Sequence, residues 1–160
     1  MKKLAIIPAY NEKQSIIFTV EDIKKNAPDF DYIIINDCST DNTMDICRYQ
    51  GYNVLNLPIN LGIGGAVQTG YLYAYNHGYD IAVQFDGDGQ HKAEYLNAMV
   101  DCLVDNDLDM VIGSRFIDNA GFQSTFLRRI GIRYFTILIK LLSGKTITDP
   151  TSGMRMCNKK

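Results

Sequence analysis

The chain has 160 residues, 46% of them hydrophobic and 21% charged, which is typical of one globular domain and excludes a disordered chain. Its net charge of −2 provides no general attraction to polyanions, so we expect no nucleic-acid partner. The four cysteines are too widely spaced for a zinc site, and no apolar run is long enough to cross a bilayer.

Short apolar runs alternate with helical stretches along the chain. The run at 4–7 is apolar throughout, as in a strand buried on both faces of a parallel sheet. Further strands are expected at 32–35, 54–57, 81–85 and 110–113, and helices at 14–26, 41–50, 64–77 and 92–106. This alternation predicts an α/β fold, with a Rossmann-like, doubly wound, mostly parallel sheet and helices on both faces.

We expect residues 1–160 to form a single domain, since no linker or repeat interrupts the pattern. The stretch that begins at Met154 is typical of another ordered element, yet the chain stops soon afterwards. The sequence therefore predicts a C-terminal truncation.

Polar clusters follow all five expected strands. They are Tyr10-Asn11-Glu12, Asn36-Asp37, Asn60-Leu61-Gly62, Asp86-Gly87-Asp88 and Ser114-Arg115. In open α/β sheets, ligands bind outside the carboxyl ends of the strands. We therefore expect a binding site at this edge of the sheet.

The Asp86-Gly87-Asp88 cluster directs two carboxylates into one small volume. Their repulsion is tolerable when a cation lies between them, and oxygen ligands favour Mg²⁺ or Mn²⁺. Gln90 and His91 are within reach as further ligands or as hydrogen-bond donors to the ligands. An Asp- and Gly-rich turn is the alternative, but the position after a strand favours the metal site.

Asp37 is a candidate for nucleoside recognition. Its carboxylate can accept hydrogen bonds from a nucleobase imide or a ribose hydroxyl. The following helix can be capped by Ser39, Thr40 or Asp41, and Asp37 lies too far upstream for that role.

The segment 60–66 resembles a glycine-rich phosphate-binding loop. Val67 takes the place of the last glycine of a dinucleotide fingerprint, and the loop follows the third strand instead of the first. The pattern disfavours a Rossmann oxidoreductase and favours a glycine-rich helix start near a nucleotide.

The segment 126–142 combines many apolar residues with basic ones. Arg129, Arg133 and Lys140 fall on one face of a helix. Such a helix is typical of a membrane interface, where cations meet phosphate groups. A core helix whose cations reach water is the alternative.

Asp149 precedes Pro150, which favours an extended backbone, and a polar turn at 151–153 follows. A carboxylate presented in this way can act as a general base. It can equally be a turn-forming residue.

Together these segments resemble the inverting family-2 glycosyltransferases, and more narrowly the dolichyl-phosphate mannose synthase and polyprenyl-phosphate glycosyltransferase branch. The matching segments occur in family order and are 7–12, 36–41, 60–66, 85–91, 113–116 and 148–155. The resemblance implies a GT-A fold and a metal-dependent transfer of one sugar, with inversion, from a UDP- or GDP-linked donor to a polyprenyl phosphate.

The resemblance also implies roles for individual residues. The donor nucleotide would be bound by Pro8, Tyr10, Glu12, Asp37, Gly62 and Asp86. The metal would be held by Asp86, Asp88 and Gln90, and the acceptor phosphate by Arg115, Arg128, Arg129 and Arg133. Asp149, with Asp88 and Arg115, would lie at the reacting centre.

The implied location is the cytoplasmic face of a membrane, with membrane helices possible after residue 160 and a homo-oligomer left open. Two other functions remain as alternatives. One is a family-2 enzyme that extends a polysaccharide or glycan, against which the basic apolar segment argues. The other is a non-catalytic nucleotide-sugar-binding module, against which Asp86, Asp88 and Asp149 argue.

Overall fold

The computed structural model describes residues 1–89, 91–114, 136–138, 140–142, 144, 149 and 152–159. The chain forms two compact units. The first comprises Met1–Val111 and Arg155–Lys160, and the second comprises Ile112–Met154.

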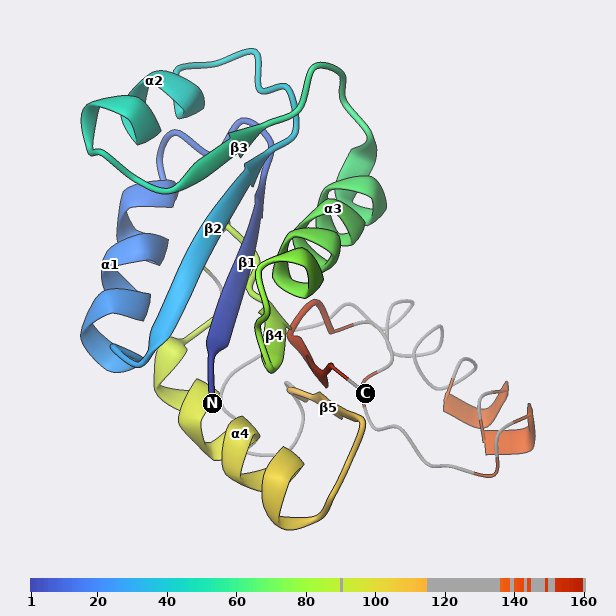
Figure 1. Ribbon diagram of the computed structural model, residues 1–160. Helices are drawn as coiled ribbons and strands as arrows, with labels where there is room; N and C mark the ends of the chain where they lie inside the picture. Colours follow the sequence, from blue (N-terminus) through green and yellow to red (C-terminus); the bar gives the residue numbers. More distant parts are fainter. Residues whose placement is uncertain are drawn as a thin grey trace. The chain divides into compact units, whose positions relative to one another are not determined.

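A six-stranded sheet forms the centre of the first unit (Figure 1). Its strands are β1 (Lys3–Ala9), β2 (Phe30–Asn36), β3 (Val54–Asn56), β4 (Ile81–Gln84), β5 (Met110–Ile112) and β6 (Arg155–Asn158). They lie in the order β3-β2-β1-β4-β6-β5, and β1 pairs in parallel with both β2 and β4. The expected α/β fold with a mostly parallel sheet is confirmed, and the strand order reverses its direction between β1 and β4.

β6 is the strand whose pairing the sequence did not predict. It runs antiparallel to β4 and lies between β4 and β5. Met156 pairs with Val83 and Cys157 with Ala82. The sequence around Met154 indicated an ordered element, but four residues of mixed polarity carry too little periodicity to specify a strand, a neighbour or a direction.

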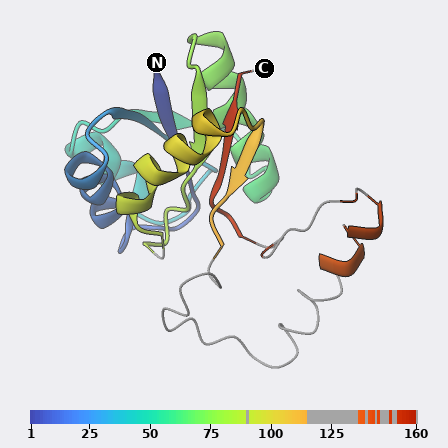
Figure 2. The ribbon, with the colours of Figure 1, turned by 90° about the horizontal axis from the view of Figure 1, so that it is seen from below.

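Four helical segments connect the strands, as expected. They are α1 (Ile16–Asn26), α2 (Thr43–Tyr49), α3 (Gly62–Asn76) and α4 (Leu96–Asp105), and the last is preceded by a short 3₁₀ turn, η1 (Ala93–Tyr95). Figures 1 and 2 show α3 on one face of the sheet and α1 and α4 on the other. Helices therefore cover both faces.

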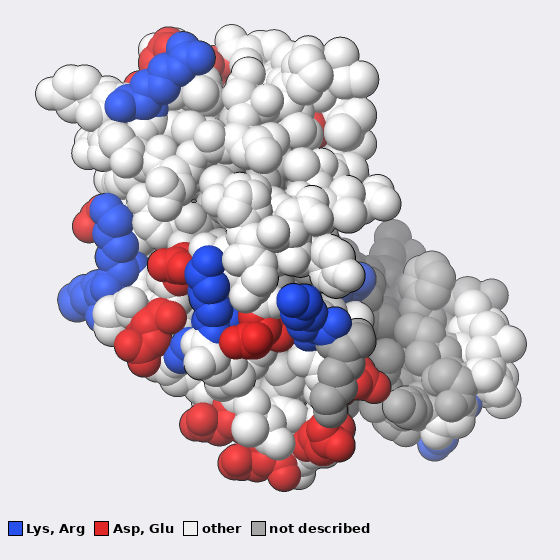
Figure 3. Space-filling view, in the orientation of Figure 1, with Lys and Arg blue, Asp and Glu red and all other residues white. Residues whose placement is uncertain are grey.

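The attachment of α3 to the sheet is apolar. A buried cluster joins Leu4 and Ile6 of β1 to Ala66 and Ala74 of α3. Residues 49–79 contain no Asp, Glu, Lys or Arg, and the surface over α3 is uncharged in Figure 3, whereas charges of both signs alternate lower on this face. Burial of apolar surface, and not ion pairing, is therefore what holds α3 in place.

In the second unit, residues 136–138 and 140–142 are helical. Across the described parts of the chain, the structure has no helix with both the length and the apolar character needed to traverse a bilayer.

Gly70 of α3 packs directly on Ile6 of β1, and it provides a test of the packing. A Cβ atom at Gly70 would lie 2.1 Å from Cγ2 of Ile6, whereas one at Gly64 of the same helix would have nothing within 4 Å. We expect Gly70→Ala to lower the free energy of unfolding by about 1–3 kcal/mol through overpacking. Gly64→Ala should raise it by about 0.5–1 kcal/mol, because alanine favours a helix.

Urea unfolding of the two variants measures both effects as shifts of the midpoint at unchanged slope. Equal stability of the two variants would contradict the close packing of α3 on β1.

Candidate functional site at the carboxyl edge of the sheet

A cavity of about 400 Å³ opens at the carboxyl ends of β1, β2 and β4. Its lining includes all the residues of the expected donor and metal sites that the structure describes, namely Pro8, Tyr10, Glu12, Asp37, Gly62, Asp86 and Asp88. The volume lies within the range of small-ligand sites, and the position is the switch point at which such sheets bind ligands. The structure thus brings together residues that are up to 80 positions apart, from Pro8 to Asp88.

The cavity is lined by acidic residues and by no basic ones that the structure describes. Four of its lining residues are acidic, namely Glu12, Asp37, Asp86 and Asp88, and its described lining includes neither Lys nor Arg. Carboxylates this close together repel any anionic ligand unless a cation neutralises part of their charge.

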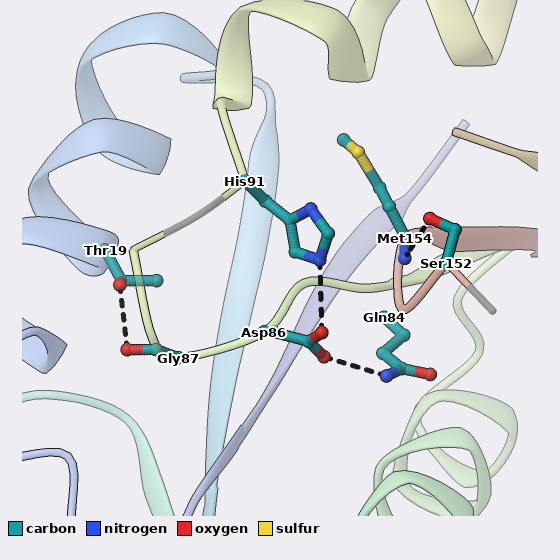
Figure 4. Close-up of polar contacts among 7 residues, drawn as sticks. All are labelled: Thr19, Gln84, Asp86, Gly87, His91, Ser152 and Met154. Carbon is teal, nitrogen blue, oxygen red and sulfur yellow. Dashed lines mark hydrogen bonds and ion pairs between the residues drawn. The ribbon is translucent and has the colours of Figure 1, made fainter. Parts of the chain in front are cut away.

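The loop after β4 places Asp86 and Asp88 at the cavity. Phe85 is fully buried and anchors the start of the loop. Oδ1 of Asp86 accepts a hydrogen bond from Nε2 of Gln84 at 2.8 Å, and Oδ2 lies 3.1 Å from Nε2 of His91 (Figure 4). Asp86 is therefore held in one orientation, while Asp88 is exposed at the cavity.

The same loop is bonded to α1 at two points. The buried Thr19 hydroxyl donates to the carbonyl oxygen of Gly87 at 3.2 Å (Figure 4). The carboxylate of Asp22 accepts from the backbone N–H of Ala93 at 2.8 Å. A Cβ atom at Gly87 would lie 3.0 Å from the carbonyl oxygen of Pro8, so the loop passes close to the end of β1. This close approach explains why the residue between the two aspartates is glycine.

The donor set fits a hard divalent cation. Within the described ranges, no three His, Cys, Asp or Glu side chains gather into a metal-binding group, so the protein would supply the two carboxylates of Asp86 and Asp88. Mg²⁺ is commonly bound by one or two carboxylates, with water and substrate phosphate completing its shell. Gln90, the third expected ligand, lies outside the described residues.

Asp37 has a structural contact that the sequence argument missed. Asp37 is 3% exposed, and its Oδ1 accepts a hydrogen bond from the backbone N–H of Leu61 at 2.7 Å. Asn60 Oδ1 likewise accepts from the N–H of Gly62 at 3.0 Å. Asp37 is indeed not the cap of α2, but it stabilises the start of α3, where a negative charge is favourable.

The N-cap of α2 is Asn42, which is none of the three expected capping residues, but Asp41 next to it stabilises the start of the helix. Its Oδ1 accepts from the N–H of Thr43 at 2.9 Å and from the Thr43 hydroxyl. Burial opposes the ionisation of Asp41, but these hydrogen bonds, together with the backbone N–H and the charge of Lys13, outweigh it, so the pKa of the carboxyl group lies below its usual value.

Asn11 is a further residue of this edge whose role the sequence reading did not identify. Its φ of 61° lies in the left-handed region, which asparagine tolerates better than most residues. Its side-chain oxygen accepts from the N–H groups of Thr40 at 2.8 Å and Asp41 at 3.2 Å. Asn11 thereby joins the loop after β1 to the loop after β2. In the sequence, only the presence of an asparagine in an expected turn could have indicated this role.

The expected acceptor residues Arg115, Arg128, Arg129 and Arg133 lie outside the described residues. Asp149 belongs to the second unit, where it is fully buried and its carbonyl oxygen accepts from the N–H of Ser152 at 3.3 Å. Ser152 Oγ in turn accepts from the N–H of Met154 at 3.2 Å (Figure 4). Thr151, the first residue of the expected polar turn, lies outside the described residues, and these two bonds are what the structure shows of the rest.

The bond between Asp37 and Leu61 predicts that two substitutions differ in stability. Asp37→Ala removes the acceptor and should lower the free energy of unfolding by about 1–2 kcal/mol. Asp37→Asn keeps a side-chain oxygen for the N–H of Leu61, so its loss should be smaller. Urea unfolding of both variants tests this, and equal losses would contradict the acceptor role.

Comparison with known proteins is consistent with this architecture. A family model described as Glycosyl transferase family 2 matches residues 4–160. The chain is 30% identical over 161 residues to the undecaprenyl-phosphate mannosyltransferase of Micrococcus luteus, covering 97% of this chain and 65% of that protein. It is 33% identical over 172 residues to the UDP-N-acetylglucosamine–dolichyl-phosphate N-acetylglucosaminyltransferase of Methanococcus voltae, covering 96% of this chain and 68% of that protein.

The fold is also similar to a solved structure. Glucosyl-3-phosphoglycerate synthase from Mycobacterium tuberculosis, in complex with Mn²⁺, uridine diphosphate and phosphoglyceric acid, superposes with a TM-score of 0.73 at 20% identity, covering 98% of this chain and 55% of that one. The chain thus spans about two thirds of the sequence relatives and about half of the structural one. With the family model matching nearly its whole length, the chain belongs to glycosyl transferase family 2.

Proposed function

We propose that this chain is the catalytic domain of an enzyme that transfers a sugar, with inversion, from a nucleoside diphosphate sugar to a polyprenyl phosphate. The observation that carries the proposal is that Asp37 and the Asp86–Asp88 pair line one and the same cavity at the carboxyl edge. A nucleoside diphosphate has a polar base and ribose at one end and a charged diphosphate at the other, and the cavity offers acceptors for the first and carboxylates for a cation on the second.

The acidity of the cavity supports a metal-dependent donor site. A diphosphate is itself an anion, so four carboxyl groups would repel it in the absence of a cation. Asp86 and Asp88 are the residues that would hold Mg²⁺ or Mn²⁺ there. When bound, such an ion neutralises the charge that develops on the leaving diphosphate.

The names of the relatives support a lipid-phosphate acceptor. The two relatives compared above act on undecaprenyl phosphate and on dolichyl phosphate, and both align with more than nine tenths of this chain. We therefore assign the acceptor to the polyprenyl phosphate class, with Arg115, Arg128, Arg129 and Arg133 as the residues proposed to bind its phosphate.

The proposed reaction needs little help from a strong base. A phosphate oxygen of the acceptor attacks the anomeric carbon from the side opposite the diphosphate, the bond from that carbon to the diphosphate oxygen breaks, and the configuration inverts. Because the acceptor phosphate is already anionic, no proton must be removed before it attacks. Because the demand for a base is weak, the role of Asp149 stays open between a base and a group that positions the acceptor.

The second unit carries features suited to a membrane surface. Among its helical residues, Ile137, Leu141 and Leu142 are 53%, 78% and 80% exposed. Exposed aliphatic side chains next to basic ones are typical of helices that lie in a membrane interface. They support the proposal that the enzyme works as a peripheral protein at the cytoplasmic face of a membrane.

The proposed metal site predicts the behaviour of Asp88→Asn. This change keeps the size of the side chain but removes one of the two charged ligands, so Mn²⁺-dependent binding of UDP or GDP should weaken at least about tenfold. Titration calorimetry with Mn²⁺ and with a chelator measures the effect. Asp101→Asn, on the exposed side of α4, is the matched control.

If the unmodified protein binds its nucleotide equally well with Mn²⁺ and with the chelator, the metal-dependent donor site is refuted.

The proposed membrane contact predicts a charge effect on vesicle binding. Replacing Arg128, Arg129 and Arg133 together by Gln should weaken binding to anionic vesicles on the order of 100-fold at low salt, at about 1 kcal/mol for each cation. A control replaces Lys24, Lys25 and Arg48 by Gln, which removes the same charge from α1 and α2. Co-sedimentation with vesicles at two salt concentrations distinguishes the variants, and equal weakening in both would show only an effect of net charge.

A further inference from the structure

Each oxygen of the Asp86 carboxylate contacts one neighbouring side chain. Gln84 approaches one oxygen and His91 the other, at 2.8 and 3.1 Å (Figure 4). Gln84 is the last residue of β4 and is 9% exposed, and the side chain of His91 is 12% exposed. Both donors are thus largely buried side chains that come from opposite ends of the loop carrying Asp86.

The two donors are themselves held in place. Gln84 lies on a strand that pairs with β1, where its partner is Ile6. The ring of His91 packs against the buried ring of Phe85, with the centroids 5.7 Å apart. The backbone next to His91 is tied to α1 by the bond from the N–H of Ala93 to Asp22. Strand pairing therefore positions Gln84, while ring packing and a bond between neighbouring backbone and α1 position His91.

We propose that Gln84 and His91 are positioning residues that orient Asp86 toward the cation of the donor diphosphate, an inference that rests on the proposed function. A carboxylate turns easily about its last side-chain bond, so an unheld Asp86 would have to be ordered each time the cation binds. A carboxylate oxygen offers two acceptor directions, so one N–H donor on an oxygen is compatible with a cation on the same oxygen.

His91 has a second possible role, because the sequence alone left it open between a direct ligand and a donor to a ligand. In the structure its Nε2 faces Asp86, so the geometry assigns it to the carboxylate. Ligands of metals are commonly oriented in this way by a neighbouring hydrogen bond, and loss of such a partner typically costs about 10–100-fold in metal affinity.

The test separates the hydrogen bond of His91 from its packing against Phe85. His91→Phe keeps a ring against Phe85 but has no donor, whereas His91→Gln loses the ring and keeps an N–H that can reach Asp86. Gln84→Met gives a second, independent loss of donor at similar side-chain length. The readouts are the affinities for UDP and GDP by calorimetry with Mn²⁺ and with a chelator, direct Mn²⁺ binding by electron paramagnetic resonance, and the melting temperature of the unliganded protein.

We expect His91→Phe and Gln84→Met each to weaken Mn²⁺ binding and Mn²⁺-dependent nucleotide binding about tenfold, with little change in the affinity measured in chelator. His91→Gln should stay within about threefold of the parent. The opposite order, with His91→Phe normal and His91→Gln impaired, would show that the ring only packs and would overturn the proposal, as would unchanged binding in all three variants.

Measurements on the unmodified protein distinguish a failure of the positioning role from a failure of the proposed donor site. Metal-dependent nucleotide binding in the parent, with no difference among the variants, overturns the positioning role alone. Absence of metal-dependent binding in the parent overturns the proposed donor site, and the positioning role with it.

Discussion

The parallel pairing of β1 with two neighbours is the constraint on which the candidate site depends. Ala9 at the end of β1 pairs with Asn36 at the end of β2, and Ile6 pairs with Gln84 at the end of β4. The backbone continues this register past the strands, since the N–H of Asp37 donates to Ala9 and the N–H of Phe85 to Ile6, both at 2.9 Å. A slip of one residue would turn every side chain of a strand to the other face, so the apolar burial of the strands also specifies where the polar residues emerge.

Once the strands set the edge, side chains bonded to backbone groups fix the loops. Asn11 joins the first two loops, Asp37 joins the second loop to α3, and Thr19 and Asp22 join the loop after β4 to α1. Each such bond is worth only about 1 kcal/mol in net stability. Their combined effect is to hold the cavity in shape before any ligand arrives, which lowers the entropy cost of binding.

The cost of this arrangement is electrostatic. Four acidic residues line one cavity, and the ligand proposed for it is an anion. Repulsion of this kind makes nucleotide binding conditional on a cation, so metal and donor are expected to bind as a pair. The hydrogen bonds from Gln84 and His91 to Asp86 fit that picture, because they hold one carboxylate of the pair in a single orientation.

The sequence by itself determined the class of fold and the edge of the sheet at which the candidate site lies. Short apolar runs predicted β1 to β5, and the helical stretches between them predicted α1 to α4. The rule that ligands bind at carboxyl ends selected polar residues that do line the cavity, among them Glu12, Asp37 and the Asp86–Asp88 pair. These features are local, since each depends on a few neighbouring residues and on the period of their hydrophobicity. That is why they could be read without coordinates.

Only the tertiary structure decided which residues touch across the chain. The insertion of β6 between β4 and β5, the bond from Leu61 to Asp37, and the link from Asn11 to Thr40 all join segments that are more than 20 residues apart. Even the hydrogen bonds from Gln84 and His91 to Asp86, which are close in sequence, depend on how the loop turns after β4. A hydrogen bond requires its partners to meet within a few tenths of an ångström, and that distance is set by strand register and loop path, which the periodicity of the sequence does not specify.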